Sequence, residues 1–336
     1  MKTNVLVVGA GFAGCTLGLL LMQAGQEVLL AELRDAHHKT KLCAGAMHHD
    51  FAASFDDIYG TKAFAKLAPY ASASVTCRCL DSEAHVSCQF EAVPRKRLDD
   101  YCLARYESEG GCLVDRVKLL SIDTTSHVAT FKDLRQSNTF AVTYDTLVGA
   151  DGVSSAVRHL LTGRKQRTCI ALQADIDRVF TDPIFEYRPM FNGYCWYIPH
   201  DAGATIGCMG HGTTNAECRG FLSDFCVALG LKKPSLRGAP IPSGDDVLLQ
   251  AGSDAWLVGD AAGLIKGRVG GGIGYALKSA HALSQALTGG EPYERAMSQT
   301  LKTIERNSSS LSAEYFRTCI NVILEARKQA SATPHE

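Results

Sequence analysis

Cys43 is the residue of this chain whose sequence neighbours best suit it for proton transfer or thiol exchange. It stands in Lys41-Leu42-Cys43-Ala44-Gly45, within a stretch that has no regular apolar period. A nearby cation such as Lys41 favours the thiolate form of a cysteine, and such a thiol can donate a proton or exchange with another thiol. The segment is therefore a candidate site of proton transfer or thiol exchange, and an inert loop cysteine is the alternative.

Histidines flank this segment on both sides, at His37, His38, His48 and His49. Two adjacent pairs do not place ligands on one face of either a helix or a strand, so we expect no metal site here. Because histidine titrates near neutrality, one of them is a further candidate proton donor. We expect most of the four to be exposed to solvent.

Three acidic residues each follow an apolar run typical of a buried strand. Glu32 follows residues 28–31, Asp151 follows residues 146–150, and Asp260 follows residues 255–259. Ligands of open α/β sheets bind at the carboxyl ends of the strands, where a carboxylate can accept hydrogen bonds from ligand hydroxyl groups. All three are therefore candidate binding residues.

The first of these acids closes a β-α-β unit over residues 1–33. An apolar run at residues 4–8 ends in a G-x-G-x-x-G pattern, and a helical pattern then extends to about Gln23. The pattern is Gly9-Ala10-Gly11-Phe12-Ala13-Gly14. Gly9 permits the tight turn, Gly11 lets the backbone approach a pyrophosphate, and Gly14 lets the helix pack on the strand. With the helix start facing the phosphates and Glu32 facing the adenosine ribose, the unit predicts a dinucleotide site. An α/β unit whose glycines serve packing alone is the alternative.

The second and third acids favour FAD over NAD as the dinucleotide. A strand-end aspartate such as Asp260 can bind a ribityl hydroxyl, and the glycine-rich helix start after it offers N–H groups to the O2 edge of a flavin. An NAD dehydrogenase does not need this second acid. The expected contacts in these motifs are Ala150, Asp151, Gly152, Gly259, Asp260, Gly270, Gly271, Gly272 and Ile273. Leu33, beside Glu32, and Val117 complete the expected cofactor contacts.

Apolar runs and breakers predict the remaining elements. Strands are expected at residues 72–80, 84–90, 112–121, 127–131, 140–143, 146–149, 168–176, 184–188, 194–198, 204–209 and 255–258. Helices are expected at residues 98–109, 154–161, 216–230 and 273–287, with one long or two shorter helices over 291–330. Pro234, Pro240 and Pro242 predict a loop. The runs between residues 112 and 143 predict a three-stranded antiparallel insert.

Composition excludes several classes of function. A net charge of −1 indicates neither a nucleic-acid partner nor an electrostatic membrane anchor. The 13 cysteines are scattered and contain no C-x-x-C, which fits a reducing cytosol. No segment reaches the ~18 apolar residues that span a membrane, and the N-terminal run does not read as a signal peptide. We expect a cytoplasmic protein and leave a peripheral membrane contact open.

The three nucleotide motifs resemble those of a large FAD-dependent group, which comprises aromatic hydroxylases, flavin halogenases and geranylgeranyl reductases. The resemblance runs from Val5 to about Ala280. Finer details are similar to the geranylgeranyl reductases. Gly263 follows the third nucleotide motif at the position where aromatic hydroxylases usually carry histidine. Residues 194–199 resemble the motif Y-x-W-x-F-P of the reductases. Residues 95–99 resemble R-x-x-F-D, and residues 41–45 resemble K-x-C-G-G, from whose glycines Ala44 and Ala46 depart.

The resemblance implies a fold and a division of the chain. It implies a glutathione-reductase-like Rossmann FAD domain assembled from residues 1–71, 93–164 and 251–290. A smaller antiparallel-sheet substrate domain would comprise residues 72–92 and 165–250. A C-terminal helical segment would cover residues 291–336.

The resemblance also implies roles for residues of the pocket. Tyr194 and Trp196 share one face of a predicted strand, which is either simple core or the aromatic lining of a substrate cavity beside the flavin. Cys43 and Ala44 would face the flavin, with Lys41 nearby. Arg95 would lie near the flavin or anchor its own helix. The cavity could also be lined by Gln173.

The implied reaction is reduction of a carbon–carbon double bond in an isoprenoid or other apolar substrate by hydride from flavin N5. Cys43 is the first candidate acid, followed by Tyr194 and water. The electron donor is either NAD(P)H or a carrier protein. Geranylgeranyl reductases are commonly longer at the C-terminus, so a smaller or different substrate is also expected.

Two other readings stay open. Halogenases carry a W-x-W-x-I-P version of the aromatic motif, and Ile198 matches it, which supports a flavin monooxygenase or halogenase. A flavin-binding redox sensor or electron carrier that uses its thiols is the non-enzymatic reading.

Overall fold

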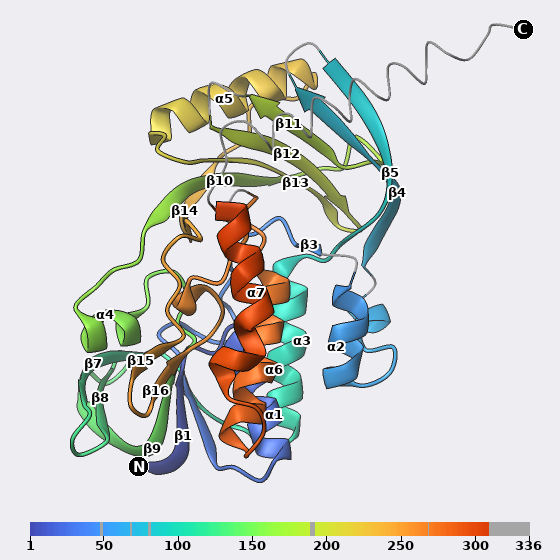
Figure 1. Cartoon of the computed structure of the whole chain (residues 1–336). Coiled ribbons are helices and arrows are strands. Elements are labelled where there is room, and N and C mark those ends of the chain that lie inside the picture. The colour runs from blue at the N-terminus through green and yellow to red at the C-terminus, as the bar shows by residue number, and fades with distance from the viewer. Residues whose placement is uncertain (48–49, 68, 80–81, 189–191, 268, 309–336) are drawn as a thin grey trace, which may run out of the picture.

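The computed structural model describes residues 1–308 except 48–49, 68, 80–81, 189–191 and 268. Two sheets organise this part of the chain, and helices cover each of them (Figure 1). The first is a mainly parallel sheet near the N-terminus, and the second is a mainly antiparallel sheet. The predicted α/β fold class is confirmed.

The parallel sheet is built around the first strand of the chain. Its order is β15 (Gln250–Gly252), β16 (Ala255–Leu257), β9 (Thr139–Gly149), β1 (Lys2–Val8), β2 (Val28–Ala31) and β6 (Cys112–Val114). The side chains of Val5 to Val8 are buried, which explains why an unbroken apolar run forms this central strand. β7 (Val117–Asp123) and β8 (Val128–Asp133) extend β9 in an antiparallel ladder, so the predicted three-stranded insert is confirmed.

Helices pack together on one side of this sheet (Figure 1). α1 (Phe12–Gln23) contacts α3 (Arg95–Ser108) and α6 (Ile273–Leu287), and α6 contacts α7 (Tyr293–Ser308). Close approach depends on small residues, because a Cβ at Gly18 would lie 2.8 Å from the ring of Tyr106. Shorter elements complete this part of the fold: α2 (Phe51–Tyr59), a 3₁₀ turn (Phe64–Leu67) and α4 (Ala156–Thr162).

The second sheet forms a roof at the end of these helices (Figure 1). Its order is β14 (Arg237–Pro242), β10 (Thr168–Ile176), β13 (Gly203–Gly210), β12 (Gly193–His200), β11 (Ile184–Arg188), β4 (Tyr70–Cys79), β5 (Ser82–Ala92) and β3 (Ala46–Met47). α5 (Asn215–Ala228) covers its outer face, where Leu172, Ile206 and Phe225 are buried. A capping box of Thr214 and Glu217 begins that helix.

Three sequence predictions about the strands are wrong in detail. The run 112–121 is two strands, because Arg116 has φ 54° and the chain turns there from a parallel partner to an antiparallel one. The runs 140–143 and 146–149 are one strand, β9, which serves both ladders. The predicted proline loop includes β14, which tolerates Pro240 and Pro242 because it is an edge strand.

Two predictions reach beyond the described residues. Of the helical region 291–330, α7 is described as far as Ser308, and residues 309–330 lie outside the described part. The strand predicted at 72–80 is β4, and Leu80 likewise lies outside it. None of the helices in the described ranges is long and apolar enough to cross a membrane.

Candidate functional site

A pocket of about 610 Å³ is lined by strands of the second sheet, by the starts of α1 and α6, and by residues that directly follow strands of the first sheet. This volume is typical of a small-molecule site. Sequence-predicted site residues form much of its wall, namely Gly11, Phe12, Ala13, Lys41, Cys43, Ala44, Arg95, Ala150, Gly152, Tyr194, Trp196, Asp260, Gly270, Gly271, Gly272 and Ile273. The fold thus brings together motifs that lie far apart in the sequence.

The other predicted residues are not among those that line the pocket. They are Gly9, Ala10, Gly14, Glu32, Leu33, Val117, Asp151 and Gly259. Leu33 is 54% exposed, and Val117 is buried in β7. Gly259 has φ 57° and lies against Ala13, so it shapes the turn that carries Asp260.

The start of α1 is open and bare. A Cβ built at Gly11 meets nothing within 4 Å, and the helix has neither a side-chain cap nor an acidic residue in its first turn. Gly14 is different, because a Cβ there would lie 1.9 Å from the carbonyl oxygen of Gly9. Gly9 has φ +106°, which favours glycine. An uncapped helix start with open space before it fits the pyrophosphate of FAD.

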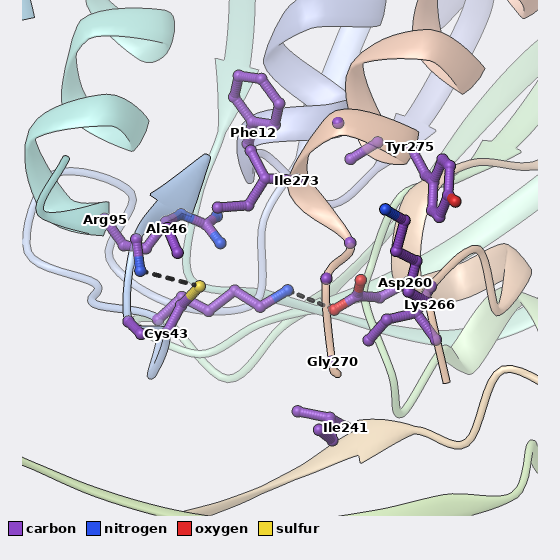
Figure 2. Close-up of a pocket in the computed structure, with 18 of the residues that line it drawn as sticks. Phe12, Cys43, Ala46, Arg95, Ile241, Asp260, Lys266, Gly270, Ile273 and Tyr275 are labelled. Atoms are coloured by element: carbon purple, nitrogen blue, oxygen red, sulfur yellow. Dashed lines mark hydrogen bonds and ion pairs between the residues drawn. The ribbon is translucent and has the colours of Figure 1, made fainter. Parts of the chain in front are cut away.

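The start of α6 is equally bare. Its N-cap is Gly272, with no side-chain hydrogen bond and no acidic residue in the first turn. Asp260 lies close to it, since a Cβ at Gly272 would be 3.1 Å from Oδ1 of that aspartate. Figure 2 shows the Asp260 carboxylate in an ion pair, and its partner is Lys41 Nζ. Two helix starts and one paired carboxylate therefore line one pocket.

The buried acid of the first motif has a partner that the sequence did not reveal. Glu32 Oε2 accepts hydrogen bonds from Lys39 Nζ at 2.8 Å and from the Ala10 N–H at 3.0 Å, and Oε1 accepts from the Arg34 N–H at 3.0 Å. Burial alone would raise the pKa of Glu32, but the charge and hydrogen bond of Lys39 hold that pKa below its ordinary value. A ribose contact for Glu32 stays a prediction.

Asp151 serves the start of α4. Its Oδ2 accepts from the N–H groups of Ala156 at 2.6 Å and Val157 at 3.2 Å, while burial raises the pKa of the carboxyl. Gln166, a residue the sequence analysis missed, donates from Nε2 to the carbonyls of Val153 at 2.6 Å and Asp260 at 2.8 Å. Gln166 therefore ties together the turns that carry the second and third acids.

Cys43 contacts a buried guanidinium. The Arg95 guanidinium interacts with its sulfur, and Nη2 of Arg95 also donates to Asp99 Oδ1 at 2.9 Å. Figure 2 shows Arg95 and Cys43 in the same part of the pocket wall. Although burial disfavours its charge, Asp99 and Cys43 raise the pKa of Arg95. The cation beside Cys43 is thus Arg95, and Lys41 turns instead to Asp260. Arg95 pairs with an acid on its own helix and also lines the pocket, and its place near the flavin stays a prediction.

The roof of the pocket is one face of the second sheet. Tyr194 and Trp196 lie there, opposite Met209 and Gly207 on β13. The Trp196 ring packs against Gly207, where a Cβ would be 2.3 Å from Cζ2. The expected aromatic lining is therefore present. Gln173 also lines the pocket and donates to the Cys43 carbonyl at 3.3 Å.

Two further expectations concern single groups. The Tyr194 hydroxyl donates to the Val269 carbonyl at 2.7 Å, so its proton is engaged just before the glycine-rich turn. His37 and His38 are exposed outside the pocket, beside Glu107 and Asp35, while His48 and His49 lie outside the described residues.

Other sequence-level expectations concern metals and thiols. Within the described ranges no cluster of His, Cys, Asp or Glu could hold a metal ion, and the cysteines there are free thiols. The sequence analysis also missed Lys266, Tyr275 and Lys278 in the pocket wall. Their closeness in sequence to the glycine-rich turn was the one signal that pointed to them.

Comparisons with known proteins identify the family and the fold of the chain. A family model described as an FAD binding domain matches residues 2–218. A geranylgeranyl diphosphate reductase from Rhodobacter capsulatus is 28% identical over 289 residues, which cover 82% of this chain and 72% of the relative. Digeranylgeranylglycerophospholipid reductase 2 from Methanothermobacter thermautotrophicus is 25% identical over 302 residues, which cover 83% and 76%.

Solved structures share the fold. A geranylgeranyl bacteriochlorophyll reductase-like protein from Thermoplasma acidophilum has a TM-score of 0.76 and 19% identity, covering 97% of this chain and 95% of that chain. A myxobacterial chondrochloren halogenase has a TM-score of 0.70 and 15% identity, covering 93% and 81%. At these identities the similarity establishes a common fold for reductases and halogenases alike.

Proposed function

This chain belongs to the FAD-binding-domain family of flavin-dependent oxidoreductases, and from that premise we propose that it reduces a carbon–carbon double bond in an isoprenoid or other apolar substrate. One observation carries the proposal. A single pocket joins two bare helix starts to an aromatic sheet face and to a thiol that contacts a buried guanidinium.

The two helix starts are the proposed cofactor contacts. Gly11 and its neighbours would take the pyrophosphate of FAD, and the turn at Gly270–Gly272 would take the flavin. Asp260 would bind the ribityl chain after exchanging its contact with Lys41. FAD, when bound, supplies the hydride-transfer chemistry of the reaction.

The sheet face is the proposed substrate wall. Trp196 and Ile198 are buried at 6% and 2% exposure, and Met209 and Ile241 add apolar surface beside them. This lining holds an apolar chain and excludes water from the reacting bond. The Tyr194 hydroxyl donates its proton to the Val269 carbonyl, so we assign Tyr194 the role of holding the glycine-rich turn in place rather than that of a proton donor.

Cys43 is the proposed proton donor at its Sγ atom. The sulfur contacts Arg95 and accepts the Gly45 N–H at 3.5 Å, which fixes its position in the pocket wall. Asp99 in turn holds the guanidinium of Arg95. Loss of the thiol should therefore slow protonation without moving the cofactor contacts.

The relatives support an isoprenoid substrate by their names, since both named reductases act on geranylgeranyl groups. Both NAD(P)H and a carrier protein remain candidate donors. We also retain as proposals the three-part division of the chain and a cytoplasmic location with peripheral membrane contact.

Product analysis tests the function. Protein loaded with FAD and reduced by dithionite without oxygen would be incubated with a panel of isoprenoid alkenes, and the products examined by mass spectrometry. We expect a product with one double bond fewer, formed slowly by Cys43→Ala. Unchanged alkenes throughout the panel, with an oxygenated or halogenated product formed only in air, would establish the oxygen-using alternative instead.

A further inference from the structure

The roof of the pocket carries an amide among apolar side chains. Ala171 and Gln173 are the residues of β10 that line the pocket. The sheet register places Ala171 opposite Met209, and it places Gln173 opposite Gly207, against which the Trp196 ring packs. Gln173 is therefore a polar residue in a part of the roof that is otherwise apolar.

The protein uses the Gln173 amide only in part. The residue is 5% exposed, and its Nε2 donates to the Cys43 carbonyl at 3.3 Å. A glutamine amide has two N–H donors and one carbonyl acceptor. Among the described residues, this hydrogen bond is the one that the structure gives to the side chain. A buried amide N–H without a partner is costly, so the second N–H calls for an acceptor on the ligand.

The thiol of the proposed proton donor lies beside this amide. Gln173 bonds to the carbonyl of Cys43 itself, so its second N–H and the Cys43 thiol belong to the same part of the pocket wall. The Arg95 guanidinium also lines the pocket and interacts with the Cys43 sulfur. A hydrogen-bond donor, a cation and a proton donor are thus neighbours.

A double bond conjugated with a carbonyl group requires this combination. Hydride addition to the β-carbon of such a bond moves its π electrons onto the carbonyl oxygen, where a hydrogen-bond donor stabilises the developing charge. The α-carbon then takes a proton, and a weak acid such as a thiol is sufficient for that step. Because one carbon atom separates the oxygen from the α-carbon, the hydrogen-bond donor and the acid must also be neighbours. An isolated double bond offers no oxygen and would leave the Gln173 N–H unpaired.

We propose that Gln173 binds the carbonyl oxygen of an α,β-unsaturated aldehyde or ketone, so that a conjugated alkene is the substrate class of this pocket. The inference rests on the proposed function and narrows it. The double bond gains a hydride from reduced FAD at its β-carbon and the Sγ proton of Cys43 at its α-carbon. The alkene thereby gains the two electrons that the cofactor loses, and the Cys43 thiolate recovers a proton from solvent.

Binding to the oxidised protein tests the carbonyl contact without turnover. FAD-loaded protein would be titrated with citral, an unsaturated aldehyde, and with 2,6-dimethylocta-2,6-diene, the hydrocarbon of the same skeleton, following the flavin absorbance. Gln173→Leu should weaken citral binding about three- to tenfold and leave the binding of the hydrocarbon and of FAD unchanged, because it removes one hydrogen bond to the oxygen. Gln89→Leu, at an exposed position of β5, is the matched control.

Products of the reduced protein test the substrate class. Citral contains a conjugated and an isolated double bond in one molecule, so each molecule carries its own control. FAD-loaded protein, photoreduced without oxygen, should convert citral to citronellal, in which the isolated bond remains. Geraniol, the matched allylic alcohol, should react at least about tenfold more slowly, and Gln173→Leu should slow the reduction of citral by about tenfold.

Two results would overturn the inference. Equal weakening of citral and hydrocarbon binding in Gln173→Leu would mean that the amide only holds the Cys43 segment in place. Reduction of geraniol as fast as citral would mean that conjugation is not required, and it would leave the proposed function intact. In a protein that reduces no alkene the proposed function fails, whereas a selective loss of citral binding in Gln173→Leu still supports the carbonyl site.

Discussion

Alanine at Gly11 should weaken FAD binding strongly while it leaves the fold intact. The residue is extended, with φ −77° and ψ −174°, and its added Cβ has no atom within 4 Å. The change therefore introduces neither strain nor a clash in the protein itself. Alanine is a poorer N-cap than glycine but restricts the unfolded chain, so the net effect on stability should stay within about 1 kcal/mol.

The effect on the cofactor should be large. The methyl group fills the space through which a pyrophosphate approaches the N–H groups of α1. Loss of one or two charge-assisted hydrogen bonds, at about 1.5–3 kcal/mol each, weakens binding by roughly a hundredfold or more.

Gly14→Ala is the matched comparison. Its Cβ would lie 1.9 Å from the Gly9 carbonyl oxygen and 3.3 Å from the Ala150 Cβ, so backbone must move. We expect this variant to lose about 1–3 kcal/mol of stability or more.

The assay measures two quantities for each variant. Urea unfolding of the apoprotein gives the free energy of unfolding, and quenching of FAD fluorescence gives the dissociation constant. Wild-type FAD affinity in Gly11→Ala would refute the assignment of α1 as the pyrophosphate site. An equal loss of stability in both variants would refute the packing argument that separates them.

Three further predictions concern single side chains. Lys39→Met should lower the free energy of unfolding by about 3 kcal/mol at neutral pH, because the buried Glu32 carboxylate loses its buried lysine partner. In the wild type the lowered pKa of Glu32 stabilises the fold at pH values above the ordinary carboxyl pKa, whereas in the variant burial should raise the pKa of Glu32. The difference in the free energy of unfolding between the two proteins should therefore shrink as the pH falls. Urea unfolding at several pH values measures this difference, and a constant difference would contradict the argument. Tyr194→Phe should lower the free energy of unfolding by about 1 kcal/mol and weaken FAD binding, because the Val269 carbonyl loses its hydrogen-bond donor. An unchanged dissociation constant for FAD would show that other contacts hold the glycine-rich turn. Cys43→Ala should slow alkene reduction about a hundredfold at unchanged FAD affinity, and a wild-type rate would exclude the thiol as the acid.

Short sequence patterns correctly predicted the elements whose formation depends on neighbouring residues. The glycines, the helix of α1 and Glu32 follow from short-range requirements of turn, packing and strand end, and the structure has each of these elements at the predicted place. The two-residue period of β12 likewise predicted that Tyr194 and Trp196 share a face.

Non-local contacts account for the predictions that were wrong or absent. β14 is a strand because it lies at a sheet edge next to β10, a position that no feature of its proline-rich sequence indicates. The cation at Cys43 comes from Arg95 at the start of α3, not from Lys41 nearby in sequence. Pairing of Lys39 with Glu32 depends on how the loop that carries Lys39 folds back onto the first motif.

The fate of the reduced protein tests the central claim most directly. FAD-loaded protein would be photoreduced and mixed in a stopped-flow cell, first with isoprenoid alkenes in the absence of oxygen and then with oxygen alone. The account predicts that an alkene reoxidises the flavin without oxygen, and that Cys43→Ala slows this reoxidation. No response to any alkene, together with a transient oxygen adduct of the flavin in air, would contradict it.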